Sequence, residues 1–81
     1  MSYGDSVGYE IKKHIGVIAP TAKNWNKELN VVAWNGGQPK LDIRGWSEDH
    51  SHMSRGITLT KDEAKMLYVL LGEYFTDEGM L

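Results

Sequence analysis

The strongest constraint on the fold lies near the C-terminal end, where residues 60–75 form an amphipathic segment. Thr60 and Glu63 have the spacing of a capping box, in which two side chains satisfy free N–H groups at the start of a helix. At about 100° per residue, the apolar side chains that follow cover an arc of roughly 200°. The members of this arc are Ala64, Met66, Leu67, Tyr68, Leu70, Leu71, Tyr74 and Phe75. A helix packed on one sheet needs about half of this arc, so a second packing partner is expected.

The length of the chain decides what can cover the surplus apolar surface. With 81 residues the protein is one domain, at a size where a single core supplies only a few kcal/mol of stability. A deep monomeric core around the helix is the alternative, but so short a chain hardly supplies one. The absence of cysteine excludes disulfides and thiolate metal sites. We therefore expect a homodimer, with an interface formed by Leu67, Leu70, Leu71 and Tyr74.

Ahead of the helix, apolar and polar residues alternate with the period of two that is typical of strands. The predicted strands are residues 9–19, 29–34, 39–46 and 57–59. Pro20 is expected to end the first strand, and residues 21–26 to form a polar loop. Asn35 and Gly36 tolerate the positive φ angles of a tight hairpin turn. The predicted fold class is therefore α+β, a four-stranded antiparallel sheet followed by one C-terminal helix, in the order ββββα.

The first strand has the longest alternation. One face is expected to carry Tyr9, Ile11, Lys13, Ile15, Val17 and Ala19, and the other to carry Glu10, Lys12 and His14. Residues 1–8 are rich in Ser, Gly and Asp and are predicted to be a disordered lead-in. The domain is then expected to span residues 9–76, with a frayed C-terminus at residues 77–81.

The net charge of −2 argues mildly against a nucleic-acid binder, but its distribution points the other way. Residues 11–46 carry six basic and two acidic side chains, a net charge of +4. Residues 61–81 carry two basic and five acidic side chains, a net charge of −3. The first half of the chain is therefore expected to form a basic surface, which is what binding to phosphates requires.

The helix can cover only one face of the sheet, so the other face is expected to be open. That face would carry Trp34, Lys40, Arg44 and Trp46. Arg44 and Trp46 lie two residues apart on one strand and so point the same way. Unpaired bases stack on Trp at ~1–3 kcal/mol per base, while Lys and Arg neutralise the phosphates. Asp42, on the same face, is expected to hold Arg44 by an ion pair.

A second set with the same chemistry is Lys23, Trp25 and Lys27, on the predicted loop and the entry to the second strand. Three Trp residues are many for a chain of 81 residues. Each of them has an alternative role as a half-buried packing residue, and carbohydrate or peptide binders also display Trp. The alternative function is therefore a protein–protein adaptor that receives a peptide on the same sheet face.

Catalysis and metal binding have little support in the sequence. The serines lie in loops without a motif, and no pair of carboxylates is embedded in apolar sequence. His50 and His52, with His14, Glu48 and Asp49 available, have a spacing that can chelate zinc. The simpler interpretation is a solvated polar loop. We expect no enzymatic activity, no catalytic residues, no metal and no cofactor.

Two stretches together resemble the positive cofactor four family of transcriptional coactivators, with a match over about residues 9–75. Residues 41–46 read Leu-Asp-Ile-Arg-Gly-Trp, and residues 55–63 read Arg-Gly-Ile-Thr-Leu-Thr-Lys-Asp-Glu. The family shows an aspartate–Ile–Arg strand followed by aromatics, and then a basic-Gly-Ile run that enters its single helix. Residues 24–30 and 34–36 resemble more closely the bacterial YdbC-like branch of that family.

The resemblance implies a strongly curved sheet, helices that pair across a two-fold axis, and grooves for single-stranded DNA without sequence preference. Matched position by position, it implies that Arg44 contacts the DNA backbone and that Trp46 stacks on or packs near bases. Arg55 matches the basic residue before the Gly-Ile run. Trp34 corresponds, with one gap, to an aromatic residue ahead of the second hairpin.

This chain also departs from the family's eukaryotic members. Their lysine-rich turn is replaced by residues 35–38, so Lys27 or Lys40 must supply the charge, and we expect no counterpart of their Ser- and Lys-rich regulatory extension. The expected function is binding of single-stranded DNA, with RNA as an alternative partner, in transcription, replication or repair. No apolar run approaches the ~20 residues of a membrane span, and no signal peptide is evident. We expect a cytoplasmic, nucleoid-associated bacterial protein with neither a membrane nor a small molecule as partner.

Overall fold

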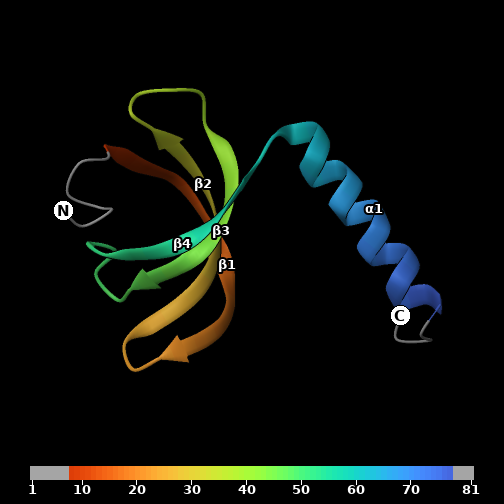
Figure 1. Cartoon of the computed structure of the whole chain (residues 1–81), viewed down its shortest axis with the longest axis horizontal. Coiled ribbons are helices and arrows are strands. Elements are labelled where there is room, and N and C mark those ends of the chain that lie inside the picture. Colours follow the sequence, from red (N-terminus) through yellow and green to blue (C-terminus); the bar gives the residue numbers. More distant parts are fainter. Residues whose placement is uncertain (1–7, 78–81) are drawn as a thin grey trace.

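The computed structural model describes residues 8–77, and its element order is the predicted ββββα. The elements are β1 (Tyr9–Ala22), β2 (Trp25–Trp34), β3 (Lys40–Ser47), β4 (Met53–Leu59) and α1 (Lys61–Asp77). The strands form one antiparallel sheet in the order β1-β2-β3-β4, which confirms the predicted fold class. Figure 1 shows that the sheet is strongly curved and that α1 stands to one side of it. The predictions for residues 1–8 and 77–81 lie, apart from Gly8 and Asp77, outside the described residues.

Strand β1 is longer and less regular than its alternation predicts. The expected end at Pro20 and the expected loop at residues 21–26 are both wrong, because β1 runs to Ala22 and β2 begins at Trp25. Proline is tolerated here because β1 is an edge strand and its register shifts between Pro20 and Ala22. The turn between the strands is tight, and Asn24 has a φ angle of 62°.

Irregularities in β1 also overturn the strict assignment of its side chains to two faces. The register shifts between Ile11 and Lys13 and again between His14 and Gly16. An extra residue at a bulge moves the following side chains to the other face of the sheet. His14 lies opposite Asn30 of β2 as a result.

The predicted hairpin turn between β2 and β3 has the expected backbone. Asn35 and Gly36 have φ angles of 52° and 74°, and the Gly37 N–H donates to the Trp34 carbonyl at 2.8 Å. Asn35 also makes two hydrogen bonds with Gly8, the residue before β1. Its side-chain oxygen accepts from the Gly8 N–H at 2.8 Å, and its own N–H donates to the Gly8 carbonyl at 2.7 Å.

The two faces of the sheet differ in a way that the sequence does not reveal. One set of alternating side chains on β2 and β3, here called the concave face, is buried; it comprises Glu28, Asn30, Val32, Asp42, Arg44 and Trp46. The opposite set, here called the convex face, is half-buried or exposed; it comprises Leu29, Val31, Leu41, Ile43, Ile57 and Leu59. The most deeply buried part of the described chain is therefore largely polar.

Helix α1 begins at the predicted capping box. The Thr60 N–H donates to Glu63 Oε1 at 2.8 Å, and the Glu63 N–H donates to Thr60 Oγ1 at 3.2 Å. The helix stands away from the sheet (Figure 1), and none of its described residues is buried. The expectation that the helix covers one face of its own sheet is therefore wrong, since the link between Leu59 and Lys61 directs α1 outwards.

Candidate nucleic-acid interface

The concave face is organised around a buried ion pair. Arg44 Nε and Nη2 donate to the two carboxylate oxygens of Asp42 at 2.6 and 2.8 Å. The Thr58 hydroxyl of β4 donates to the same carboxylate at 2.9 Å. Two parallel bonds between ionised groups fix the orientation of a guanidinium group. The predicted pair of Asp42 and Arg44 is confirmed, but Arg44 is only 5% exposed.

Aromatic rings fill the rest of the concave face. Tyr9 lies 5.2 Å from Trp46 and 6.1 Å from Trp34 between ring centroids, and the His50 ring lies 5.7 Å from Trp46. These spacings are those of packed aromatic pairs. Trp46 is completely buried, and its Nε1 has no hydrogen-bond partner among the residues that the structure describes.

The expectation of an open sheet face therefore needs correction. Trp46 and Arg44 are buried and Trp34 is half-buried, whereas Lys40 is exposed at the start of β3. The sheet curls around its concave side, and Tyr9 and His50 cover the Trp46 ring. A contact between nucleic acid and Arg44 or Trp46 stays a prediction, and for Trp46 it requires Tyr9 and His50 to move.

A second group of predicted residues meets at a surface hollow of about 440 Å³, here called the β-hollow. Trp25 and Lys27 line it from β2, and Arg55 lines it from β4. Trp25 is half-buried, while Lys27 and Arg55 are exposed. An indole ring and two cations that line the same hollow have the composition of a site that stacks a base and neutralises its phosphates. Lys23 is exposed on the adjacent β1–β2 turn, and Lys40 lies at the other end of β3.

Two glycines shape the floor of the β-hollow. A Cβ atom at Gly56 would overlap the Ile43 carbonyl and the Arg44 side chain. A Cβ atom at Gly45 would lie 2.9 Å from the Ser54 hydroxyl, which now accepts the Gly45 N–H at 2.9 Å. Only glycine permits such close approaches of two strands. The glycines therefore leave room beside the Trp25 ring.

Sequence reasoning missed a polar cluster on the concave face. Glu28 is 3% exposed, and its carboxylate accepts from Asn30 Nδ2 at 3.0 Å and meets His50 Nε2 at 2.9 and 3.0 Å. His14 Nδ1 lies 2.7 Å from Asn30 Oδ1 and 3.4 Å from Glu28 Oε1. The available signal was the even spacing of Glu28 and Asn30 with Val32, which places all three on one face.

The β3–β4 loop has its own hydrogen-bond network. Asp49 accepts from the Ser51 hydroxyl at 2.7 Å, from the Ser51 N–H at 3.0 Å and from the Ser47 hydroxyl at 2.9 Å. These bonds, those of Ser51 foremost, lower the pKa of Asp49 from 3.8 to about 2. Within residues 8–77, no group of three or more His, Asp or Glu side chains is arranged to hold a metal ion. No helix in the same range is long and apolar enough to cross a membrane.

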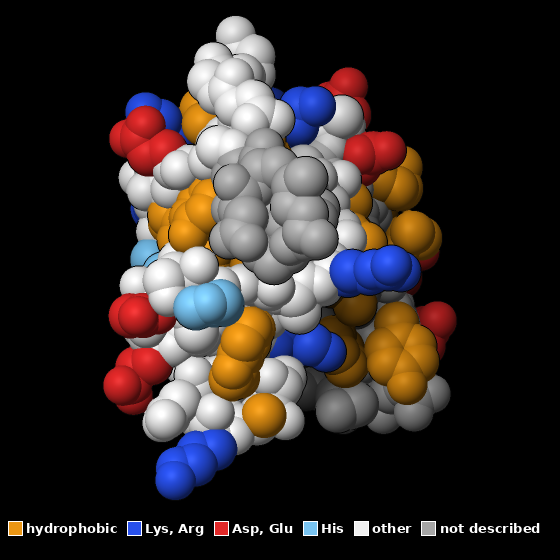
Figure 2. All heavy atoms as spheres, turned by 60° about the vertical axis from the view of Figure 1, so that its left-hand side comes forward, with side chains coloured by type: hydrophobic (Ala, Val, Ile, Leu, Met, Phe, Trp, Pro, Cys, Tyr) orange, Lys and Arg blue, Asp and Glu red, His pale blue; other side chains and the backbone are white. Residues whose placement is uncertain are grey.

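Figure 2 turns the open side of the curved sheet forward and shows hydrophobic, histidine and basic side chains close together on it. Acidic side chains gather mainly towards the margins of this view.

Comparisons with known proteins show the family of the chain. The family model described as Transcriptional Coactivator p15 (PC4) matches residues 21–70. An uncharacterized protein of Treponema pallidum (strain Nichols) is 38% identical over 73 residues, which cover 90% of this chain and 86% of that protein. The match of the family model spans β2, β3, β4 and the first part of α1. The chain therefore belongs to the PC4 family of transcriptional coactivator p15.

Proposed function

We propose that this protein binds single-stranded DNA without sequence preference and works as a homodimer. The observation that carries the proposal is the β-hollow, which Trp25, Lys27 and Arg55 line together. Membership of the PC4 family, a non-enzymatic family that binds single-stranded DNA, supports the same function.

The chemistry of the β-hollow favours an unpaired strand over a duplex. In a duplex the faces of the bases are stacked on one another and cannot reach the Trp25 ring. A single strand can place one base on the indole and the flanking phosphates near Lys27 and Arg55. Lys23, on the neighbouring turn, extends the path of positive charge. Because every base has a π face, such a site is tolerant of sequence.

Arg44 and Trp46 have a different place in this proposal. Their burial assigns them first to the shape of the sheet, because Asp42 and Arg44 tie β3 to Thr58 of β4. Trp34 has a share in both roles, shaping the sheet and binding the strand. It packs against the Arg44 guanidinium, and it is only half-buried.

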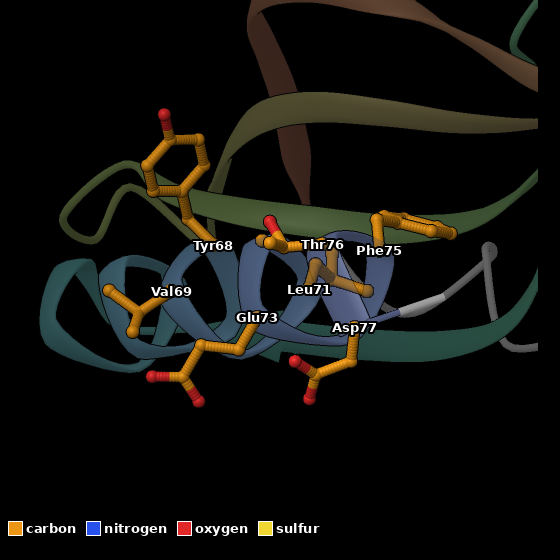
Figure 3. A pocket seen from close by; sticks show the side chains of 8 residues that line it. Tyr68, Val69, Leu71, Glu73, Phe75, Thr76 and Asp77 are labelled. Carbon is orange, nitrogen blue, oxygen red and sulfur yellow. The ribbon is translucent and has the colours of Figure 1, made fainter. Parts of the chain in front are cut away.

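The homodimer is proposed because α1 leaves a broad apolar surface uncovered. Leu70 and Tyr74 are 52% and 56% exposed, and Met66 and Leu71 are also exposed. A hollow of about 790 Å³ runs along the same helix, lined by Tyr68, Leu71 and Phe75 among others (Figure 3). A monomer rarely exposes so many large apolar side chains on one element. The proposed interface comprises Leu67, Leu70, Leu71 and Tyr74.

The test is a titration of labelled single-stranded DNA, single-stranded RNA and matched duplex DNA, each at low and at high salt. The proposal expects tight binding of the single strand, weak binding of the duplex, and affinity that falls steeply as salt rises. Equal affinities for single-stranded RNA and DNA would show that the protein binds both nucleic acids. Binding of neither nucleic acid, together with salt-insensitive capture of a peptide, would favour the adaptor function instead.

A further inference from the structure

Trp46 is covered by two residues that are joined to each other. Tyr9, from the start of β1, and His50, from the β3–β4 loop, both pack against its ring. The Tyr9 hydroxyl donates to the His50 carbonyl at 2.6 Å, across 41 positions of sequence. Tyr9 and His50 therefore form one cover, and His50 connects it to the rest of the concave face.

The side chain of His50 is the anchor of this cover. Its Nε2 meets both oxygens of the Glu28 carboxylate, at 2.9 and 3.0 Å. The backbone of His50 has a φ angle of 60°, in the left-handed region that is uncommon for residues other than Gly but that His adopts more often than most. The contact with Glu28 holds the side chain of His50, while the His50 N–H holds the loop by donating to the Ser47 carbonyl at 2.9 Å.

The charges around Glu28 make this contact depend on a proton. The groups that face the Glu28 carboxylate are His14 from β1, Asn30 from β2 and His50 from the loop, and Arg44 lies opposite it on β3. The Arg44 guanidinium is bound by Asp42. Imidazole is the side chain whose charge ordinarily changes between pH 5 and 8. A protonated imidazole binds a buried carboxylate more strongly than a neutral one does.

We propose that His50 and Glu28 form a proton-dependent latch that closes Tyr9 and the β3–β4 loop over Trp46. A charged imidazole favours the closed state. A neutral imidazole binds the carboxylate less strongly, and the cover then opens more readily. Opening exposes the Trp46 ring and its unpartnered Nε1 to a base. This inference rests on the proposed function for its ligand, but not for the latch itself.

The latch makes a prediction that is opposite in sign to simple electrostatics. Protonation of histidines near a nucleic-acid site normally raises affinity for DNA, because it adds positive charge. A latch that closes on protonation instead makes single-strand binding weaker at pH 5 than at pH 8. The sign of the pH dependence at constant ionic strength therefore separates the two explanations.

The first experiment measures the latch without any nucleic acid. The exchange rate of the Trp46 indole N–H with solvent is followed by NMR from pH 5 to pH 8 and corrected for the intrinsic pH dependence of indole exchange. The corrected rate is expected to rise roughly threefold or more over this range. His50→Gln keeps a hydrogen-bond donor for Glu28 but cannot change its charge, so its corrected rate is expected to be independent of pH. A flat profile in the parent protein, or the same rise in His50→Gln, would overturn the latch.

The second experiment measures the affinity for a single-stranded oligonucleotide over the same range of pH. The parent protein is expected to lose affinity between pH 8 and pH 5, while His50→Gln shows little change. His14→Gln is the comparison variant, because it removes the other imidazole near Glu28, whose ring lies 6.4 Å from that of His50, and leaves the contact of His50 with Glu28 in place. A parent affinity that rises towards pH 5 would overturn the link between latch and binding. If no oligonucleotide binds at any pH while the indole exchange still depends on His50, the proposed function fails and the latch stands.

Discussion

The guanidinium carbon of Arg44 lies 4.5 Å from the centre of the Trp34 ring, although the register of the sheet places Arg44 opposite Glu28. The two residues meet because the sheet curls, not because they are neighbours across the hairpin. Stacking of a guanidinium on an indole face is favourable, and more so where water is excluded. Arg44 therefore joins β3 to the end of β2 as well as to Asp42.

Loss of the Arg44 charge is expected to destabilise the fold. Arg44→Met leaves the fully buried Asp42 carboxylate without its partner, and we expect the free energy of unfolding to fall by about 3–5 kcal/mol. Urea unfolding checks this value. Arg55→Met, at an exposed position of the same sheet, is the control, and an equal loss in both variants would contradict the structural role. Adding Asp42→Leu to Arg44→Met is expected to recover part of the loss.

Gly56 is predicted to be irreplaceable because of the close approach between β3 and β4. Gly56→Ala would push Cβ into the Ile43 carbonyl, and overpacking of this kind costs about 1–3 kcal/mol or more. Gly16→Ala, at a position of the same sheet with nothing within 4 Å of the new Cβ, is expected to change little. Thermal unfolding of the two variants measures the difference. A Gly56→Ala protein as stable as Gly16→Ala would contradict the packing described here.

The apolar surface of α1 is expected to fail as an interface when it carries a charge. Leu70→Glu should convert the proposed dimer to a monomer, because a buried, unpaired carboxylate is costly at an interface. Lys65→Glu introduces the same side chain on the same helix outside the apolar arc and is expected to remain dimeric. Sedimentation equilibrium distinguishes the two states. A parent protein that is monomeric at all concentrations would refute the dimer directly.

The lowered pKa of Asp49 predicts how the β3–β4 loop responds to acid. A carboxyl group whose pKa is lowered in the folded state adds stability above its unfolded pKa and loses that contribution as the pH falls. The loop should therefore keep its hydrogen bonds above about pH 4 and lose them as the pH falls towards 2. Ser51→Ala removes the principal cause and should raise the Asp49 pKa towards 3.8, as measured by NMR titration. An unchanged pKa in that variant would show that Ser51 is not its cause.

Local signals in the sequence were sufficient for the elements that depend on near neighbours. The capping box of Thr60 and Glu63, the turn at Asn35 and Gly36, and the pair of Asp42 and Arg44 all act within three residues. Each of these has a direct physical cause in the residues themselves, such as a free N–H group or a positive φ angle. The order of the elements followed from the same kind of evidence.

The burial of Trp46 could not be predicted, because it does not depend on near neighbours in the sequence. It depends on the curl of the whole sheet and on Tyr9 and His50, which are far apart in sequence. An alternating pattern shows which side chains share a face, but not which face curls inwards. The bulges of β1, which place His14 beside Asn30, likewise depend on pairing with β2. Of the predicted binding residues, Trp25, Lys27 and Arg55 meet at the β-hollow, and Arg44 helps to line it from a buried position.

Trp25 is expected to supply stacking at the β-hollow. Trp25→Ala should weaken binding of single-stranded DNA by ~1–3 kcal/mol, which is the usual contribution of one stacked base. Trp25→Phe keeps an aromatic face and should retain most of the affinity. Fluorescence anisotropy of a labelled oligonucleotide gives both values. Equal affinities for the Ala and Phe variants would exclude stacking at this position.

The most direct test of the central claim is the salt dependence of single-strand binding in three charge variants. Lys27→Gln and Arg55→Gln each remove one cation from the β-hollow, and Lys12→Gln removes an exposed cation that pairs with Glu10 at 3.1 Å. In a plot of log affinity against log salt concentration, the slope should become less steep by about 0.7 for each lost phosphate contact. We predict this change for Lys27→Gln and Arg55→Gln and the parent slope for Lys12→Gln. Parent slopes in all three variants would contradict the placement of the DNA backbone at the β-hollow.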